Sequence, residues 1–220
     1  MEEIYADYNG SAPICNEVKE YLINRLNKGP FANPNATHHV GARVKVAMEN
    51  ARSICAKLLG AHMSQLIFNS GSTEGISTVF QSVLLNNPKK KIIISGIEHS
   101  AVTNNAEFFA NNFGHEVYIL KTKPNGIVDV EDLLNNIDEN TALVAVMAAN
   151  NETGVIQPYT DIAKICQEKG APYLCDTTQF VGKTEFNFTD SAIDYAVVAG
   201  HKIGGITGTG ILIAKDTTSL

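Results

Sequence analysis

Residues 197–202 carry an apolar run into a basic pair, His201 and Lys202, and a glycine-rich loop over 204–210 follows. A lysine that follows a strand among small residues can be held in a pocket with little water, where its amine is available as a nucleophile toward an aldehyde. The alternative is a solvated lysine that closes a strand at the surface, as most lysines do. The other polar motifs of the chain have to decide between these interpretations.

A short polar motif stands between an apolar run at 66–68 and a helical pattern. It reads Ser-Gly-Ser-Thr over 70–73. Gly71 lets a ligand approach the backbone closely, and the free N–H groups at a helix start bind phosphate. An ordinary helix cap supplied by Ser70 or Ser72 is the alternative.

Two further motifs follow apolar runs in the same way. His99 comes after the run 91–95, where an imidazole can stack on a flat aromatic ligand, move protons, or simply mark a helix entry. Asn150 and Asn151 follow the run 142–148. Their amides can bond a ligand oxygen, or they can form a turn.

Asp176 directly follows the apolar run 172–175. A carboxylate beside a buried strand is costly unless a cation pairs with it, and a protonated ring nitrogen would serve. Gln179, three residues on, could reach a ring oxygen. The alternative for Asp176 is a helix cap.

Together these motifs supply a phosphate cradle, a stacking imidazole, an anion, an amide and an amine. Pyridoxal 5'-phosphate requires all five, because its aldehyde bonds to a lysine and a carboxylate keeps its pyridine nitrogen protonated. We therefore expect a pyridoxal-phosphate site.

The elements that must position these groups alternate along the chain. Strands interleaved with helices predict an α/β fold, a three-layer sandwich whose mostly parallel sheet is covered on both faces. Ligands bind such sheets beyond the carboxyl ends of the strands, where the polar motifs stand. The predicted strands are 66–68, 91–95, 115–120, 142–148, 172–175, 193–198 and 210–214, and the helices between them are 74–85, 100–111, 130–137 and 159–169.

Two helices are predicted before the alternation begins, over about 15–26 and 41–59. Apolar residues recur in both at a helical interval, and in the second they predict a buried stripe. The stripe consists of Val44, Met48, Ala51, Cys55 and Leu58.

The composition is that of an ordinary globular protein, with 220 residues, 44% of them hydrophobic, and a net charge of −6. Without a basic cluster, a signal-peptide pattern or an apolar run of spanning length, we expect a cytoplasmic protein that binds neither nucleic acid nor membrane. The four cysteines show no CxxC spacing, and we expect no metal site. Cys55, Cys166 and Cys175 sit in apolar patterns and are predicted to be reduced core residues.

Seven motifs, in order, resemble the class V aminotransferase family, and within it the cysteine desulfurases of the NifS and IscS type. The resemblance runs from residue 5 to residue 213. The motifs are YADYNGSAP (5–13), ANP (32–34), SGSTE (70–74), EHSAV (98–102), NNETGVIQP (150–158), DTTQ (176–179) and HK (201–202).

The resemblance implies roles around the cofactor ring. Lys202 would bind the aldehyde covalently and move protons at the substrate, and His99 would stack on the ring. Asp176 would pair with the ring nitrogen, and Gln179 would bond the phenolic oxygen.

It also implies roles at the two ends of the bound molecule. Gly71, Ser72 and Thr73 would hold the phosphate together with His201. Asn151 would lie near the substrate carboxylate.

Two positions depart from the family pattern. Ala199 stands where relatives carry a phosphate-binding serine, which removes a hydrogen bond worth about 1–3 kcal/mol if nothing replaces it. The loop after the lysine reads Gly-Ile-Thr-Gly over 205–208, where relatives usually have Gly-Pro-Lys-Gly.

For the whole chain, the resemblance implies the large domain of a fold-type I pyridoxal-phosphate-dependent transferase. Residues 15–220 would be the cofactor-binding large domain, truncated at its C-terminus. Residues 1–14 would belong with a second, small domain that is missing. The complete protein would be a homodimer that serves iron–sulfur cluster assembly with a sulfur-acceptor protein.

The implied reaction removes sulfur from L-cysteine to give alanine and an enzyme persulfide. Relatives carry the nucleophilic cysteine on a mobile loop well after the lysine, and none of the four cysteines here fits that place. We therefore expect the 220-residue chain alone to be inactive. The alternatives are a selenocysteine lyase or a class V aminotransferase with the same cofactor site, or a non-catalytic relative or fragment.

Overall fold

The computed structural model describes residues 4–220, so the first three positions of the predicted segment 1–14 lie outside the described residues. Seven strands form one sheet in the order β1-β7-β6-β5-β4-β2-β3. Strand β7 is antiparallel to both of its neighbours, and the other neighbouring pairs are parallel. The strands are β1 (Leu66–Asn69), β2 (Lys91–Ser95), β3 (Glu116–Leu120), β4 (Thr141–Ala145), β5 (Tyr173–Asp176), β6 (Tyr195–Ala199) and β7 (Gly210–Ala214).

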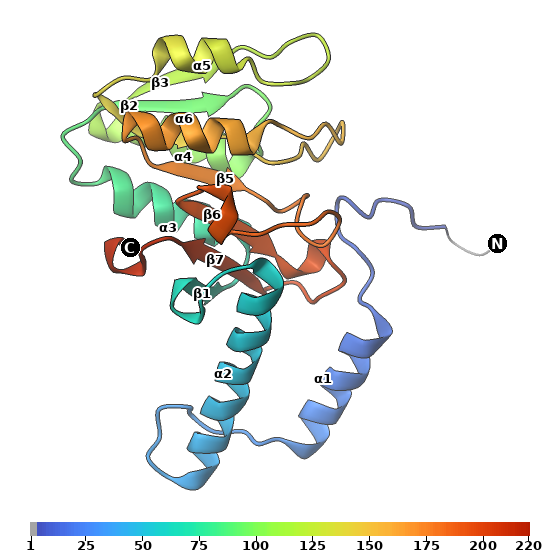
Figure 1. The fold of residues 1–220 in the computed structure, drawn as a ribbon. Helices are drawn as coiled ribbons and strands as arrows, with labels where there is room; N and C mark the ends of the chain where they lie inside the picture. The colour runs from blue at the N-terminus through green and yellow to red at the C-terminus, as the bar shows by residue number, and fades with distance from the viewer. Residues whose placement is uncertain (1–3) are drawn as a thin grey trace.

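Helices cover both faces of this sheet, as Figure 1 shows. Helices α3 and α4 pack against one face, and α5 and α6 share the apolar cluster on the other. The predicted α/β sandwich with a mostly parallel sheet is therefore confirmed. The helices are α1 (Asn16–Lys28), α2 (His39–Leu59), α3 (Ser72–Leu84), α4 (Ser100–Phe113), α5 (Val130–Asn136) and α6 (Tyr159–Lys169).

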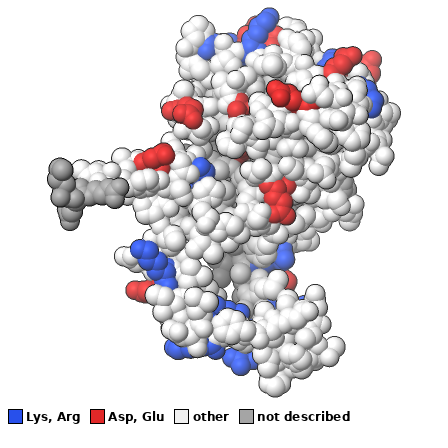
Figure 2. Space-filling model, turned by 180° about the vertical axis from the view of Figure 1, so that it is seen from behind, with Lys and Arg blue, Asp and Glu red and all other residues white. Residues whose placement is uncertain are grey.

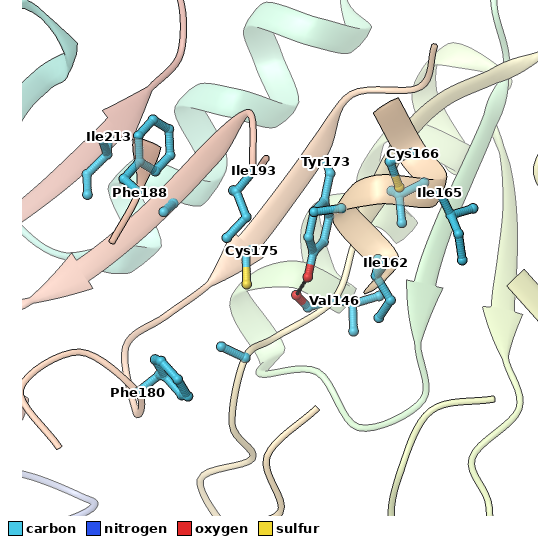
Figure 3. Packing of buried hydrophobic residues seen from close by; sticks show 14 of the residues in the cluster. Val146, Ile162, Ile165, Cys166, Tyr173, Cys175, Phe180, Phe188, Ile193 and Ile213 are labelled. Atoms are coloured by element: carbon cyan, nitrogen blue, oxygen red, sulfur yellow. Dashed lines mark hydrogen bonds between the residues drawn. The ribbon is translucent and has the colours of Figure 1, made fainter. Parts of the chain in front are cut away.

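The core is densest around the central strands β4 and β5, whose residues are all buried. The fully buried Tyr173 donates its hydroxyl to the Val146 carbonyl at 2.9 Å, which satisfies the polar end of the ring (Figure 3). Cys166 and Cys175 lie in the same cluster, and burial raises the pKa of the Cys166 thiol to about 12. These two cysteines are free core residues, as predicted, while Cys55 is half-buried at the edge of the cluster.

Helices α1 and α2, with the loop that joins them, project from the sheet as an arm (residues 16–59; Figure 1). Helix α1 has no fully buried residue, since Val18 and Leu22 of its apolar face are half-buried and Leu26 is 70% exposed. The predicted stripe of α2 is only partly correct. Val44 is buried and Cys55 is half-buried against the core, whereas Ala51 is exposed, Met48 is 40% exposed and Leu58 is 75% exposed. Periodicity defines an apolar face but does not say what covers it.

The arm also differs from the body in charge. It carries seven Lys or Arg side chains against three Glu, although the chain as a whole has a net charge of −6. Figure 2 shows these basic side chains gathered on the lower lobe, with acidic side chains spread over the body above. The arm therefore carries both a net positive charge and exposed apolar side chains.

Residues 4–220 lack two features that mark other classes of protein. Among these residues, no helix combines the length and apolar character needed to cross a membrane. In the same part of the chain, no three His, Cys, Asp or Glu side chains are placed to hold a metal ion together.

We expect His115 to make the fold sensitive to acid. Its ring is 4% exposed and packs edge-on against Phe109, and burial, with the charge of Lys90 adding, lowers its pKa from 6.5. The unfolded chain then binds more protons than the folded one, so the free energy of unfolding falls as the pH drops below about 6.5. His115→Phe should flatten this dependence in urea unfolding at pH 5 and pH 7.5. The exposed control His39→Phe should keep the wild-type slope, and an unchanged slope in His115→Phe would contradict the assignment.

Candidate active site

A cavity of about 610 Å³ opens at the carboxyl ends of the parallel strands. Its volume lies in the range of about 300–1,000 Å³ that small-molecule sites occupy. All nine site residues predicted from the sequence line it, although their chemical roles remain predictions. They are Gly71, Ser72, Thr73, His99, Asn151, Asp176, Gln179, His201 and Lys202.

Asp176 is the last residue of β5 and places a buried carboxyl group on the cavity wall. Its Oδ1 accepts a hydrogen bond from the Thr178 N–H at 2.9 Å. Burial raises the pKa of this carboxyl, while the nearby His99 and Lys202 act in the opposite direction. The charged form is therefore costly here, and a ligand cation against it would remove that cost.

The turn before α3 leaves the start of that helix open to the cavity. The N-cap residue is Gly71, and no side chain caps the helix, so the alternative of a cap from Ser70 or Ser72 is wrong. Ser70 instead donates its hydroxyl to Glu74 at 2.5 Å. The Ser72 hydroxyl bonds the Thr178 hydroxyl at 2.6 Å, which places a second hydroxyl beside the helix start.

Glycines permit this arrangement. Gly71 has φ +153°, a conformation that residues with a Cβ rarely adopt, and space is open where its Cβ would lie. A Cβ on Gly210 would come within 2.5 Å of the Gly71 Cα. The backbone donors at the start of α3 therefore form a cradle that suits a phosphate group.

Lys202 ends a 3-10 turn (Gly200–Lys202) that follows β6. Its Nζ donates to the carbonyls of Asn9 and Gly10, both at 2.7 Å. In the sequence, Asn9 and Gly10 stand in the motif over 5–13, and nothing in their spacing relates them to Lys202. The N-terminal segment thus lies across the site and holds the amine.

His201 and His99 flank the amine and the buried carboxyl. The His201 carbonyl accepts from the Ala12 N–H at 2.8 Å, and burial, with Lys202 adding, lowers the pKa of its ring. His99 marks the entry to α4, because its Nδ1 accepts from the Ala101 N–H at 3.1 Å. The residue also lines the cavity, and its stacking on a ligand stays a prediction. A neutral His99 ring must then carry its proton on Nε2.

The two adjacent asparagines, Asn150 and Asn151, have different surroundings. Asn150 is buried and builds the turn, since its Oδ1 accepts from the N–H groups of Glu152 and Thr153 at 3.0 and 2.9 Å. Asn151 lines the cavity, and its carbonyl accepts from the Asn9 side chain at 3.1 Å.

Glu98, next to His99 in the chain, is a buried carboxyl that the sequence analysis did not identify. Its Oε1 accepts from the Met147 N–H at 2.9 Å and from the Ser95 hydroxyl, while its Oε2 is buried without a hydrogen-bond partner among the described residues. Burial raises the pKa of this carboxyl to about 8, and the charge of Asp176 adds to the effect. In the sequence it stands in a polar turn, where no signal separates a buried carboxyl from a solvated one.

The two departures from the family pattern also lie at the cavity. Ala199 is buried on its wall, and Thr207 and Gly208 of the altered loop line it as well. The position at which relatives carry a serine hydroxyl is therefore on the wall of the cavity.

The fold is that of the aminotransferase-like proteins. Residues 4–219 match the family described as Aminotransferase class-V, and the chain belongs to that family.

Among the curated relatives, cysteine desulfurase IscS of Rickettsia typhi is 41% identical over 215 residues, which are 96% of this chain and 52% of that protein. The counterpart in Rickettsia prowazekii is 40% identical with the same coverage. The chain spans about half the length of the curated relatives it matches.

Solved structures agree with these relatives. A NifS-like protein superposes with a TM-score of 0.93 at 33% identity, over 98% of this chain and 60% of its own. A structure of SspA in complex with cysteine gives 0.94 at 31% identity, over 99% and 63%.

We expect Glu98→Gln to stabilise the protein at alkaline pH. Between pH 4.5 and about 8 the folded chain holds a proton on Glu98 that the unfolded chain releases, so wild-type stability falls as the pH rises through this window. Glutamine keeps the acceptor for Met147 without the titration, and its advantage in urea unfolding should grow toward pH 8 to on the order of 1–3 kcal/mol. Glu107→Gln, an exposed change on α4, should show no such trend. Equal stability of Glu98→Gln and wild type at pH 5 and pH 8 would refute a protonated Glu98.

Proposed function

We propose that the cavity binds pyridoxal 5'-phosphate and that the complete protein removes sulfur from L-cysteine, giving alanine and a persulfide. The observation that carries this proposal is the meeting of Lys202, Asp176 and the uncapped start of α3 at one cavity. An amine, a buried anion and a phosphate cradle are the groups that this cofactor needs. When bound, the cofactor withdraws electron density from the substrate α-carbon.

The chain's own residues would bind and orient the ring. Asp176 would keep the ring nitrogen protonated, because a buried carboxylate paired with a cation costs less free energy than the same carboxylate unpaired. His99 offers a ring face held by its bond to Ala101. The Lys202 amine would hold the cofactor through its aldehyde and would carry a proton to or from the substrate α-carbon. The carbonyls of Asn9 and Gly10 accept from this amine at the site.

The phosphate end would rest on backbone donors more than on charge. The N–H groups at the start of α3 and the ring of His201 are the proposed donors. Ala199 has no hydroxyl to offer the phosphate. The hydroxyls of Ser72 and Thr178, which line the cavity and bond each other, are the proposed substitutes.

The substrate and partners are proposals for the complete protein. Support for cysteine comes from the curated desulfurases and from the SspA structure, which is titled as a complex with cysteine. None of the described residues that line the cavity is a cysteine. We propose that a thiol outside these four cysteines accepts the sulfur, that the 220-residue chain alone does not turn over, and that the complete protein is a homodimer serving iron–sulfur cluster assembly. We also propose that residues 1–14 belong with a small domain and 15–220 form the cofactor-binding domain.

Lys202→Ala should abolish covalent uptake of the cofactor. Wild-type chain mixed with pyridoxal 5'-phosphate and reduced with borohydride should carry the pyridoxyl group on Lys202 in peptide mass spectra, because Lys202 is the one lysine among the described residues that line the cavity. The exposed control Lys57→Ala should label like wild type. A wild-type chain that takes up no cofactor, or a label that stays in Lys202→Ala, would sink the proposal.

Asp176→Asn should separate binding from folding. The amide keeps the size of the side chain but cannot stabilise a protonated ring nitrogen, so the Kd for pyridoxal 5'-phosphate should rise at least about tenfold. Without cofactor the variant should be as stable as wild type or more so, because a buried carboxyl is removed. Equal affinities in a spectroscopic titration would contradict the role given to Asp176.

A further inference from the structure

Lys183 lies just outside the cavity and contacts a side chain that lines it. A helical turn, with Val181 N–H bonded to the Thr177 carbonyl at 3.0 Å and Lys183 N–H to the Phe180 carbonyl at 3.1 Å, places Gln179 and Lys183 on one side. The Lys183 Nζ donates to Gln179 Oε1 and, at 3.0 Å, to Asn9 Oδ1.

The three side chains form a closed network. Gln179 Nε2 donates to the Asn9 carbonyl at 2.9 Å, and this carbonyl also accepts from Lys202. Asn9 in turn donates its Nδ2 to the Asn151 carbonyl at 3.1 Å. Closed networks of this kind hold each member in one orientation, since every rotation breaks two bonds.

An amide group has two ends of similar shape and opposite hydrogen-bonding character, so only its partners decide which end faces where. Lysine is a donor without acceptor atoms, and it therefore takes the oxygen end of Gln179. The Nε2 end donates one N–H to the Asn9 carbonyl, which leaves its second N–H for a ligand in the cavity that Gln179 lines. The Asn9 carbonyl, an acceptor, holds the nitrogen end of the amide, and Lys183 is the donor that holds the oxygen end among the described contacts of Gln179.

We propose that Lys183 is a positioning residue that turns the Gln179 amide so that an N–H, and not a carbonyl oxygen, meets the ring oxygen of the bound cofactor. This inference rests on the proposed function. A donor favours the ionised form of the ring oxygen, whereas an acceptor in its place favours the protonated form. Lys183 thereby sets the proton affinity of a cofactor atom that it does not touch.

Lys183 is exposed, so its contacts add little to the stability of the fold. Lys183→Met should therefore fold, and it removes the donor while keeping an unbranched side chain. Lys183→Arg keeps a donor at the same place and should rescue. The matched control is Lys19→Met, the same change at an exposed position on α1.

The first measurement needs no cofactor. In the ¹⁵N-labelled chain, the side-chain amide signals of Gln179, assigned with Gln179→Ala, should shift in Lys183→Met and exchange faster with water. They should stay near their wild-type positions in Lys183→Arg and Lys19→Met. Unchanged Gln179 signals in Lys183→Met would overturn the proposal.

The second measurement uses added pyridoxal 5'-phosphate. The pH midpoint at which the absorbance of the bound cofactor changes should rise by about one unit in Lys183→Met, a tenfold change in proton affinity, and not in Lys183→Arg. In a Gln179→Ala background, Lys183→Met should cause no further shift, because the two side chains act as one. A shift that persists without Gln179 would mean that the charge of Lys183 acts directly, and would overturn the positioning role. A wild-type chain that binds no cofactor would refute the proposed function, while the amide signals would still decide the contact.

Discussion

A carboxyl group buried at the end of the central strand is the constraint on which the rest of the site depends. Asp176 cannot move away from the cavity wall, because β5 is hydrogen-bonded between β4 and β6 and its residues are all buried. Charge at that position demands a cation nearby. Burial raises the pKa of Asp176, while His99 and Lys202, which line the same cavity, act to lower it, and burial also raises the pKa of the neighbouring Glu98 carboxyl.

The site is assembled from both ends of the chain. Strands β2, β4, β5 and β6 bring their carboxyl ends together, as parallel strands must, and each contributes a following turn. The N-terminal segment then closes one side by its carbonyl bonds to Lys202, which stands 193 positions away from Asn9. The amine is thus held by a backbone segment that belongs to no helix or strand.

The sheet could be predicted from the sequence because its strands are continuous apolar runs bounded by glycine and polar residues. Strands β2 and β7 and helix α6 have the predicted bounds, and the polar residues after the strands meet at one cavity. The failures have a common cause. The stripe of α2, the contact between Asn9 and Lys202 and the burial of Glu98 all depend on what lies opposite a residue in space, which local spacing does not encode. The orientation of the Gln179 amide belongs to the same class, since only a long-range partner network fixes it.

The hydrogen bonds between the N-terminal segment and the Lys202 amine have a practical consequence for labelling this protein. A tag or fluorescent label attached upstream of Asn9 would act on the segment whose carbonyls accept from the Lys202 amine, and so on the position of that amine.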